Sequence, residues 1–115
     1  MIRKAEQNVA YSREAMRGGA GSVIFRDIAT PEEMFYKARL FTKITLKPGC
    51  GIGYHEHHGE CEIYLITKGT AVYNDNGVET IVSAGDVTIT LDGQGHAAEN
   101  RGTEDVEIIA LIPLQ

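Results

Sequence analysis

Turn signals recur along this 115-residue chain at intervals of about ten residues, and this spacing is its strongest constraint on the fold. Clusters of Gly, Pro, Asn, Asp and Ser separate short segments that are rich in Val, Ile, Thr, Tyr and Phe. Short strands with frequent turns favour an antiparallel β-sandwich or barrel over a helical fold. We therefore predict an all-β chain, with strand composition over residues 22–29, 39–46, 63–67, 70–73, 78–82, 87–91 and 106–113.

Two local signals are more specific. Asn76-Gly77 lies between two β-rich segments, and both residues tolerate the positive φ values of a tight turn, so this pair predicts a hairpin. Thr30-Pro31-Glu32-Glu33 has a capping residue, a proline at the first helical position and acidic side chains in the first turn. We therefore expect a short helical turn there, in an otherwise β-rich chain.

Length and composition indicate one ordinary globular domain spanning residues 1–115. Residues 1–21 are the least regular part and are expected to form an N-terminal arm. The net charge is −5 without any basic run, so neither nucleic acid nor an anionic membrane is an expected partner. No apolar stretch has the length of a signal peptide or a membrane span, and the two cysteines are too few for a disulfide scaffold. A reduced, cytoplasmic protein is expected.

The segment from Gly49 to Gly69 holds three of the four histidines. His55 and His57 are two residues apart, so on a strand their imidazoles leave the same face and can share one metal ion. Glu62 follows His57 at an odd offset, but a bend at His58-Gly59 would return it to the same pocket. Glu60 has the same strand parity as Glu62 and is the rival carboxylate ligand.

The other polar or reactive side chains of this segment have simpler interpretations. His58 is expected to point outward or into the turn. Cys61 alternates to the opposite face, and it and Cys50 are expected to be small packing residues rather than metal thiolates. Tyr64 shares the face of Glu62 and can line the pocket, although a packed aromatic residue is the interpretation we favour.

Two blocks of the sequence resemble the conserved motifs of the cupin superfamily. The first block, residues 49–69, has Gly, five residues, His, one residue, His, four residues, Glu, six residues and Gly. The second block, residues 85–100, has Gly, seven residues, Gly, two residues, His96, three residues and Asn. The second block departs from the pattern once, because Leu91 stands where the family has a proline. The resemblance implies a small antiparallel β-barrel of jelly-roll type, with two facing sheets and a metal site inside.

The resemblance also implies a ligand set of His55, His57, Glu62 and His96. Three imidazoles and one carboxylate suit one divalent transition metal ion, namely Mn, Fe, Ni, Co, Cu or Zn. If the ion has six ligands, two positions stay open for water or substrate; if it is four-coordinate zinc, the site is closed and structural. The coordination number therefore determines whether this is an active site.

The resemblance leaves several functions open. The first hypothesis is a metal-dependent enzyme, such as an oxygenase or isomerase, acting on a small polar metabolite. The alternative is a non-catalytic barrel that uses the metal to bind or sense a sugar or organic acid, and a purely structural metal is a third possibility. Since small barrels have exposed edge strands, we also expect a homodimer, with the irregular N-terminal region and residues 22–29 pairing across a two-fold axis.

Overall fold

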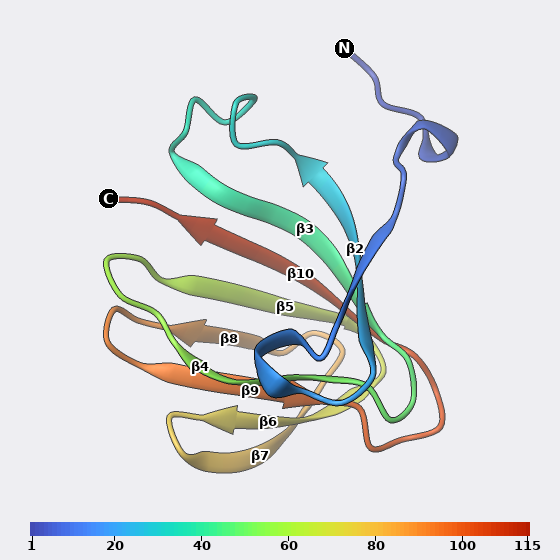
Figure 1. Ribbon diagram of the computed structural model, residues 1–115, viewed down its shortest axis with the longest axis vertical. Helices are drawn as coiled ribbons and strands as arrows, with labels where there is room; N and C mark the ends of the chain where they lie inside the picture. The colour runs from blue at the N-terminus through green and yellow to red at the C-terminus, as the bar shows by residue number, and fades with distance from the viewer.

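The computed structural model describes residues 1–115 and contains two antiparallel β-sheets that face each other (Figure 1). The six-stranded sheet has the order β1-β2-β3-β10-β5-β8, and the four-stranded sheet has the order β4-β9-β6-β7. The predicted all-β jelly roll is therefore confirmed. The strands are β1 (Tyr11–Glu14), β2 (Ser22–Ala29), β3 (Ala38–Leu46), β4 (Gly51–Glu56), β5 (Glu62–Lys68), β6 (Thr70–Asp75), β7 (Val78–Ser83), β8 (Val87–Thr90), β9 (Gly95–Glu99) and β10 (Val106–Pro113).

The hydrophobic core lies between the two sheets and follows from the period-two alternation of the strands. On β10 every second residue faces the core, and these four are at most 3% exposed. They are Val106, Ile108, Ala110 and Ile112. The central strand β3 contributes Ile44 and Leu46 to the same core, as its alternation predicts.

The hairpin between β6 and β7 has the predicted two-residue turn. Asn76 has a φ of 52° and Gly77 a φ of 101°, so both lie in the left-handed region that a tight hairpin turn requires. The Asn74 side chain accepts a hydrogen bond of 2.7 Å from the Gly77 N–H, which fixes the turn further. The Asn-Gly signal was therefore sufficient to locate this hairpin.

The segment after β2 contains the predicted turn but no longer helix. Thr30 and Glu33 cap each other: the Thr30 N–H donates to Glu33 Oε1 at 2.9 Å, and the Glu33 N–H donates to Thr30 Oγ1 at 3.2 Å. The Met34 N–H reaches the Thr30 carbonyl at 3.2 Å, which closes one helical turn. The turn ends there because Phe35 and Tyr36 have φ values of 54° and 57°.

The N-terminal arm is more regular than its composition suggests. It contains β1 and two 3₁₀ turns, η1 (Ala5–Gln7) and η2 (Met16–Gly18). β1 pairs with residues 22–25 of β2, and β3 pairs with the other edge of β2, so the arm covers the first half of the edge that β2 would offer to a second molecule. The expectation that the N-terminal region and residues 22–29 pair across a two-fold axis stays a prediction, and the outermost strand on this side of the sheet is β1.

The arm packs very closely against β4, the strand that leads to the histidines (Figure 1). A Cβ atom on Gly53 would collide with the Arg17 carbonyl oxygen, and a Cβ atom on Gly19 would collide with the Gly51 carbonyl oxygen. Only glycine allows the two backbones to approach in this way. Glycines at these positions therefore permit η2 to rest directly on β4.

The outer faces of the two sheets differ in polarity. On the six-stranded sheet, the register aligns Leu111, Ile63 and Ile89 in one row, and Ile109, Leu65 and Val87 in the next. The outward side chains of β8 are about half exposed, whereas Thr90 on the same strand faces inward and is 1% exposed. The outer face of the four-stranded sheet instead mixes polar residues, including Asn74, Glu79 and Glu99, with apolar ones such as Ile81.

No helical segment of the structure combines the length and the apolar composition needed to cross a bilayer.

Candidate metal centre

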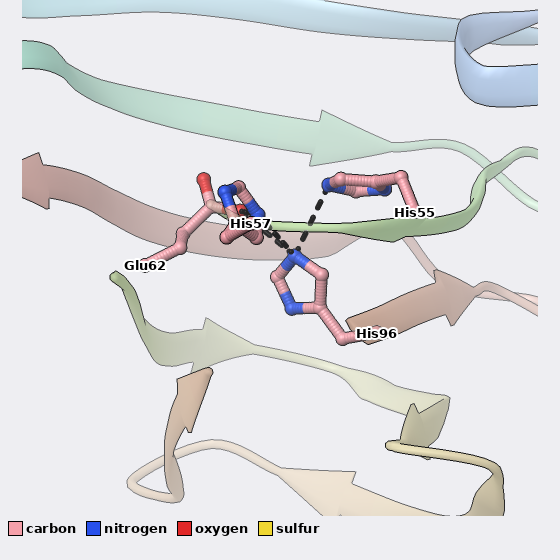
Figure 2. Close-up of side chains that lie close together, drawn as sticks. All are labelled: His55, His57, Glu62 and His96. Atoms are coloured by element: carbon pink, nitrogen blue, oxygen red, sulfur yellow. Dashed lines mark hydrogen bonds and ion pairs between the residues drawn. The ribbon is translucent and has the colours of Figure 1, made fainter. Parts of the chain in front are cut away.

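The four residues expected to bind a metal come together between the two sheets (Figure 2). Each offers one ligand atom, and these atoms all lie within 4.8 Å of one another. His96 Nε2 lies 3.1 Å from His57 Nε2, 3.2 Å from His55 Nε2 and 2.9 Å from Glu62 Oε1. His57 Nε2 lies 3.1 Å from the same Glu62 oxygen. The structure therefore brings together all of His55, His57, Glu62 and His96.

Strand pairing explains how residues 41 positions apart come to meet. β4 and β9 are antiparallel neighbours, and their register places His55 directly opposite His96. His57 follows the end of β4, where its N–H and carbonyl bond to the backbone of Gln94 and Gly93. The chain then bends and returns as β5, so that Glu62 begins that strand facing inward. The predicted bend at His58-Gly59 therefore lies where the expected return of Glu62 requires it.

The centre is protected from solvent. His57 and Glu62 are each 3% exposed and His96 is 1% exposed, whereas His55 is half-buried. A buried carboxylate requires compensation by hydrogen bonds or an opposite charge, and the imidazole nitrogens of His57 and His96 lie 3.1 and 2.9 Å from Glu62 Oε1. The burial of this polar group is therefore costly unless a cation or a protonated histidine accompanies it.

The Nδ1 atom of each histidine has an acceptor on the side away from the centre. His55 Nδ1 lies 2.9 Å from the Gly53 carbonyl oxygen, and His57 Nδ1 lies 2.6 Å from Glu60 Oε2. Carbonyl and carboxylate oxygens only accept, so in the neutral rings the proton sits on Nδ1 and leaves a lone pair on Nε2. Three Nε2 atoms and a carboxylate oxygen, all facing inward, repel one another without a cation between them. The donor set therefore fits a divalent metal ion.

His96 is held by two hydroxyl groups that sequence reasoning did not identify. Its Nδ1 lies 2.7 Å from Tyr73 Oη and 2.9 Å from Thr90 Oγ1, and these two oxygens are 3.0 Å apart. Tyr73 comes from β6 and Thr90 from β8, so both sheets contribute to the orientation of this ring. No sequence motif marks either residue, because they approach His96 only after the sheets have packed.

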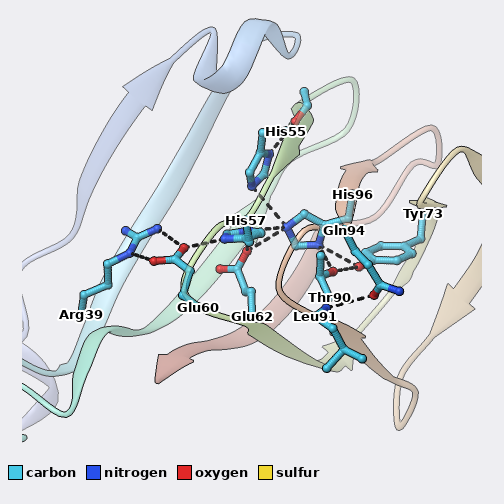
Figure 3. Close-up of polar contacts among 11 residues, drawn as sticks. Arg39, His55, His57, Glu60, Glu62, Tyr73, Thr90, Leu91, Gln94 and His96 are labelled. Carbon is cyan, nitrogen blue, oxygen red and sulfur yellow. Dashed lines mark hydrogen bonds and ion pairs between the residues drawn. The ribbon is translucent and has the colours of Figure 1, made fainter. Parts of the chain in front are cut away.

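Glu60 does not join the four inward-facing ligand atoms (Figure 3). Its carboxylate forms a two-point ion pair with Arg39, in which Nε and Nη2 each lie 2.6 Å from a carboxylate oxygen. The second oxygen also contacts His57 Nδ1. Glu60 precedes β5 in the turn and is not part of that strand, so it does not share the strand parity that made it the rival ligand.

Electrostatic surroundings shift the pKa values of several of these groups. Burial is the largest influence on the Glu62 pKa and raises it, but hydrogen bonds from His57 and His96 together lower it to about 2. The Arg39 guanidinium lowers the pKa of Glu60 to about 2, with a further contribution from His57. The hydrogen bond to Glu62 raises the pKa of His57, whereas burial lowers the pKa of His55.

The remaining candidates from the sequence lie outside the cluster. His58 is exposed, as predicted, and the thiols of Cys50 and Cys61 are free and absent from the inward-facing group. Tyr64 is buried and packs against the His96 ring with centroids 5.0 Å apart, and it also lines the neighbouring cavity. Both interpretations of this tyrosine are therefore correct.

A cavity of about 490 Å³ opens onto one side of the cluster. His55, His57 and Glu62 form part of its wall, and Tyr64 and Ile52 lie beside them. The arm closes the opposite side, with Arg13, Glu14 and Arg17 among the lining residues. A volume of this size is within the range of small-molecule sites, so the cluster has space for a ligand next to it.

Comparison with known proteins identifies the family. The cupin domain family matches residues 42–112, which include all four clustered residues. The chain belongs to the cupin family. This match covers more than half of the chain and confirms the resemblance that the two motif blocks suggested, although Leu91 replaces the usual proline.

Individual relatives extend this finding. An oxalate-binding protein from Thermotoga maritima is 46% identical over 99 residues, which cover 86% of this cupin and 82% of the relative. The crystal structure of a predicted oxalate decarboxylase from the same organism is 40% identical, has a TM-score of 0.95 and is matched over 100% of both chains. A cupin from Salinispora arenicola has a TM-score of 0.73 at 20% identity, covering 97% of this chain and 87% of its own, which indicates a shared fold alone.

Proposed function

We propose that this cupin binds one divalent transition metal ion through His55, His57, Glu62 and His96. The observation that carries the proposal is the convergence of three Nε2 atoms and one carboxylate oxygen, which all lie within 4.8 Å of one another, with His96 Nε2 2.9–3.2 Å from each of the other three. Neighbouring ligands around a first-row ion with metal–ligand distances of about 2.1 Å are separated by about 3 Å. Mixed nitrogen and oxygen ligands are compatible with Mn, Fe, Ni, Co, Cu or Zn, so the identity of the ion is a matter for measurement.

We propose further that the metal-loaded protein binds a small chelating carboxylic acid, of which oxalate is the first candidate. The cavity beside the cluster supports this, because it leaves one side of the centre accessible. Arg13 and Arg17 contribute positive charge to the cavity wall, next to Glu14 and Asp27, whereas the charge of Arg39 is paired with Glu60. The 46% identity to an oxalate-binding protein supports the same class of ligand.

Turnover of the bound acid is the second candidate function. A divalent ion supplies Lewis acidity, which polarises the carboxylate oxygens of a chelating ligand. Glu14, Arg13 and Arg17 are charged side chains of the arm that line the same cavity. A catalytic role is favoured by this arrangement, since a purely structural site has no need of an adjoining cavity.

Calorimetric titration of oxalate into the manganese-loaded and the metal-free protein tests the proposal. Oxalate chelates through two carboxylates, so we expect binding only to the loaded protein and much weaker binding of acetate, which has one carboxylate. Glu62→Gln protein, treated in the same way, should bind neither metal nor oxalate. Equal binding of oxalate to the metal-free protein, or no binding to the loaded one, would contradict the proposal.

We also propose that residues 1–115 act as one domain that forms a homodimer through the outer face of the six-stranded sheet. The rows formed by β10, β5 and β8 expose Leu65, Val87 and Ile89 to fractions of 39–57%. These rows carry no charge, so they match a second apolar surface rather than a charged partner. Two such faces related by a two-fold axis pack as the sheets of a β-sandwich do.

Light scattering of Ile89→Asp and Ile81→Asp proteins tests this interface. Both isoleucines are exposed, by 54% and 61%, but Ile81 lies on the outer face of the other sheet. We expect the mass of one 12.6 kDa chain for Ile89→Asp and twice that mass for both the parent protein and Ile81→Asp. A monomeric parent protein, or a dimer that survives Ile89→Asp, would exclude this interface.

A cytoplasmic location stays a prediction, and the two free cysteines agree with it.

A further inference from the structure

Glu60 connects a surface arginine to a buried histidine. One of its carboxylate oxygens lies 2.6 Å from His57 Nδ1, and the two-point ion pair with Arg39 holds the same carboxylate from the other side (Figure 3). The exposed fractions of the side chains decrease along this series, from 45% for Arg39 to 12% for Glu60 and 2% for His57. The three groups therefore form a continuous chain of hydrogen bonds from the surface to the cluster.

His57 differs from the other two histidines in the charge of its outer acceptor. His55 Nδ1 faces the carbonyl oxygen of Gly53, and His96 Nδ1 faces the hydroxyls of Tyr73 and Thr90, so both have neutral partners. Only His57 has a carboxylate in this position. A change at Glu60 should therefore act on one histidine of the three.

The backbone around Glu60 is held in place independently of its side chain. The Gly59 N–H donates to Asp92 Oδ1 at 2.7 Å, which fixes the turn that carries Glu60. Glu60 itself forms an isolated bridge with Leu114 near the C-terminus. Changing the Glu60 carboxylate therefore leaves the path of the turn supported.

We propose that Glu60, held by Arg39, is a positioning residue that fixes the proton of His57 on Nδ1 and so presents the Nε2 lone pair to the metal. This inference rests on the metal-binding part of the proposed function. The hydrogen bond made by one ring nitrogen sets which nitrogen carries the proton, and a carboxylate acceptor also makes the ring a better donor to a metal. Arg39 keeps the carboxylate oriented, because a two-point pair allows little rotation.

Metal affinity of Glu60→Gln protein, compared with Glu56→Gln, tests the proposal. Both changes remove one negative charge close to the cluster in sequence, but Glu56 is exposed and contacts none of the ligand side chains. We expect Glu60→Gln to weaken zinc binding by about ten- to a hundredfold, the usual effect of removing a partner of a metal-binding histidine. Glu56→Gln should bind zinc within about twofold of the parent protein, and competition with a chelating dye measures all three affinities.

Nitrogen NMR of the metal-free proteins, at a pH where the rings are neutral, separates positioning from a general structural effect. We expect His57 to carry its proton on Nδ1 in the parent protein and in Glu56→Gln, and to shift partly to the Nε2-protonated form in Glu60→Gln. The double variant Arg39→Met/Glu60→Gln removes the charges of both partners, so it keeps the test valid if the unpaired Arg39 of the single variant destabilises the fold.

The outcomes distinguish this inference from the proposed function. A parent protein that binds no metal contradicts the proposed function itself. A parent protein that binds metal, together with a Glu60→Gln protein of equal affinity, contradicts only the role of Glu60. Weaker zinc binding without any change in the His57 proton position would also overturn it, because the effect would then be structural.

Discussion

Glu60 and Glu62 are two residues apart but lie in two different regions, the turn before β5 and the first position of that strand. The turn places Glu60 against Arg39, which neutralises it, whereas the strand places Glu62 against the imidazole nitrogens of His57 and His96. Both carboxylates have a pKa of about 2, but for different reasons: Glu60 has a permanent cation beside it, and Glu62 depends on the histidines. The comparison indicates that the available counter-charge determines which carboxylate can serve a metal.

The largest expected difference between the two regions is in metal content. Glu62→Gln removes the only charged ligand and leaves an amide among three imidazoles, so the protein should emerge from gel filtration without metal, a loss of affinity well beyond a hundredfold. His57→Ala should behave similarly. Elemental analysis by mass spectrometry measures the stoichiometry. Retention of one ion per chain by Glu62→Gln would show that the comparison assigns the wrong carboxylate.

Acid should release the metal next. Protons compete with the ion for the imidazoles, and the Glu62 hydrogen bond raises the pKa of His57 above its ordinary value of 6.5. As the pH is lowered, the metal affinity should therefore already begin to decrease before the pH reaches 6.5. Below that point it should decrease by about tenfold per pH unit for each histidine that must lose a proton to bind the metal. Measurements of zinc affinity across the pH range in which histidines titrate test whether the affinity decreases in acid. A constant affinity through the histidine range would argue against imidazole ligands.

A smaller loss of zinc affinity is expected when the hydrogen-bond partner that is removed from a histidine is uncharged. Tyr73→Phe removes one hydroxyl beside His96 Nδ1, but Thr90 Oγ1 remains within 2.9 Å as an acceptor. Zinc affinity should therefore weaken by less than about tenfold, which is below the effect expected for Glu60→Gln. Adding Thr90→Val should increase the loss. If Tyr73→Phe weakens binding more than Glu60→Gln does, a charged acceptor has no special value here.

The smallest effect concerns the metal-free protein in acid. Because the folded state holds the Glu60 pKa at about 2, against an ordinary value of 4.5, its ionised form contributes stability that is fully present above pH 4.5. This contribution is lost as the pH falls through 4.5 toward about 2. Thermal unfolding of the parent and Glu60→Gln proteins over this range should show a shallower decline for the variant. Parallel curves would show that the Arg39 pair adds little to folding.

The sequence was sufficient for the architecture and for the residues that converge. The spacing of turns predicted the all-β fold, and the two motif blocks indicated His55, His57, Glu62 and His96. These features are local or lie at fixed offsets, so one chain reveals them. The supporting residues were not predictable in this way, because Arg39, Tyr73 and Thr90 approach the cluster from separate strands only after both sheets pack.

Strand parity and alternation did not determine which way some side chains face. Strand parity made Glu60 a rival of Glu62, but parity applies only within a continuous strand and β5 begins at Glu62. Alternation on β8 was visible in the sequence, but it did not reveal that Thr88 and Thr90 face inward while Val87 and Ile89 face outward. An apolar row usually marks the core side of a strand, so this orientation requires the structure.

The glycine contact between the arm and β4 links access to the cavity with metal affinity, two properties that could otherwise vary separately. Gly53 accepts the Nδ1 hydrogen of His55 through its carbonyl oxygen, and its missing side chain lets η2 settle against the strand. The same residue thus orients a metal-facing ring and determines how near Arg17 sits to the ligand space. Any larger residue there would widen the entrance and disturb the ring in a single step, so access and affinity should change together at this position.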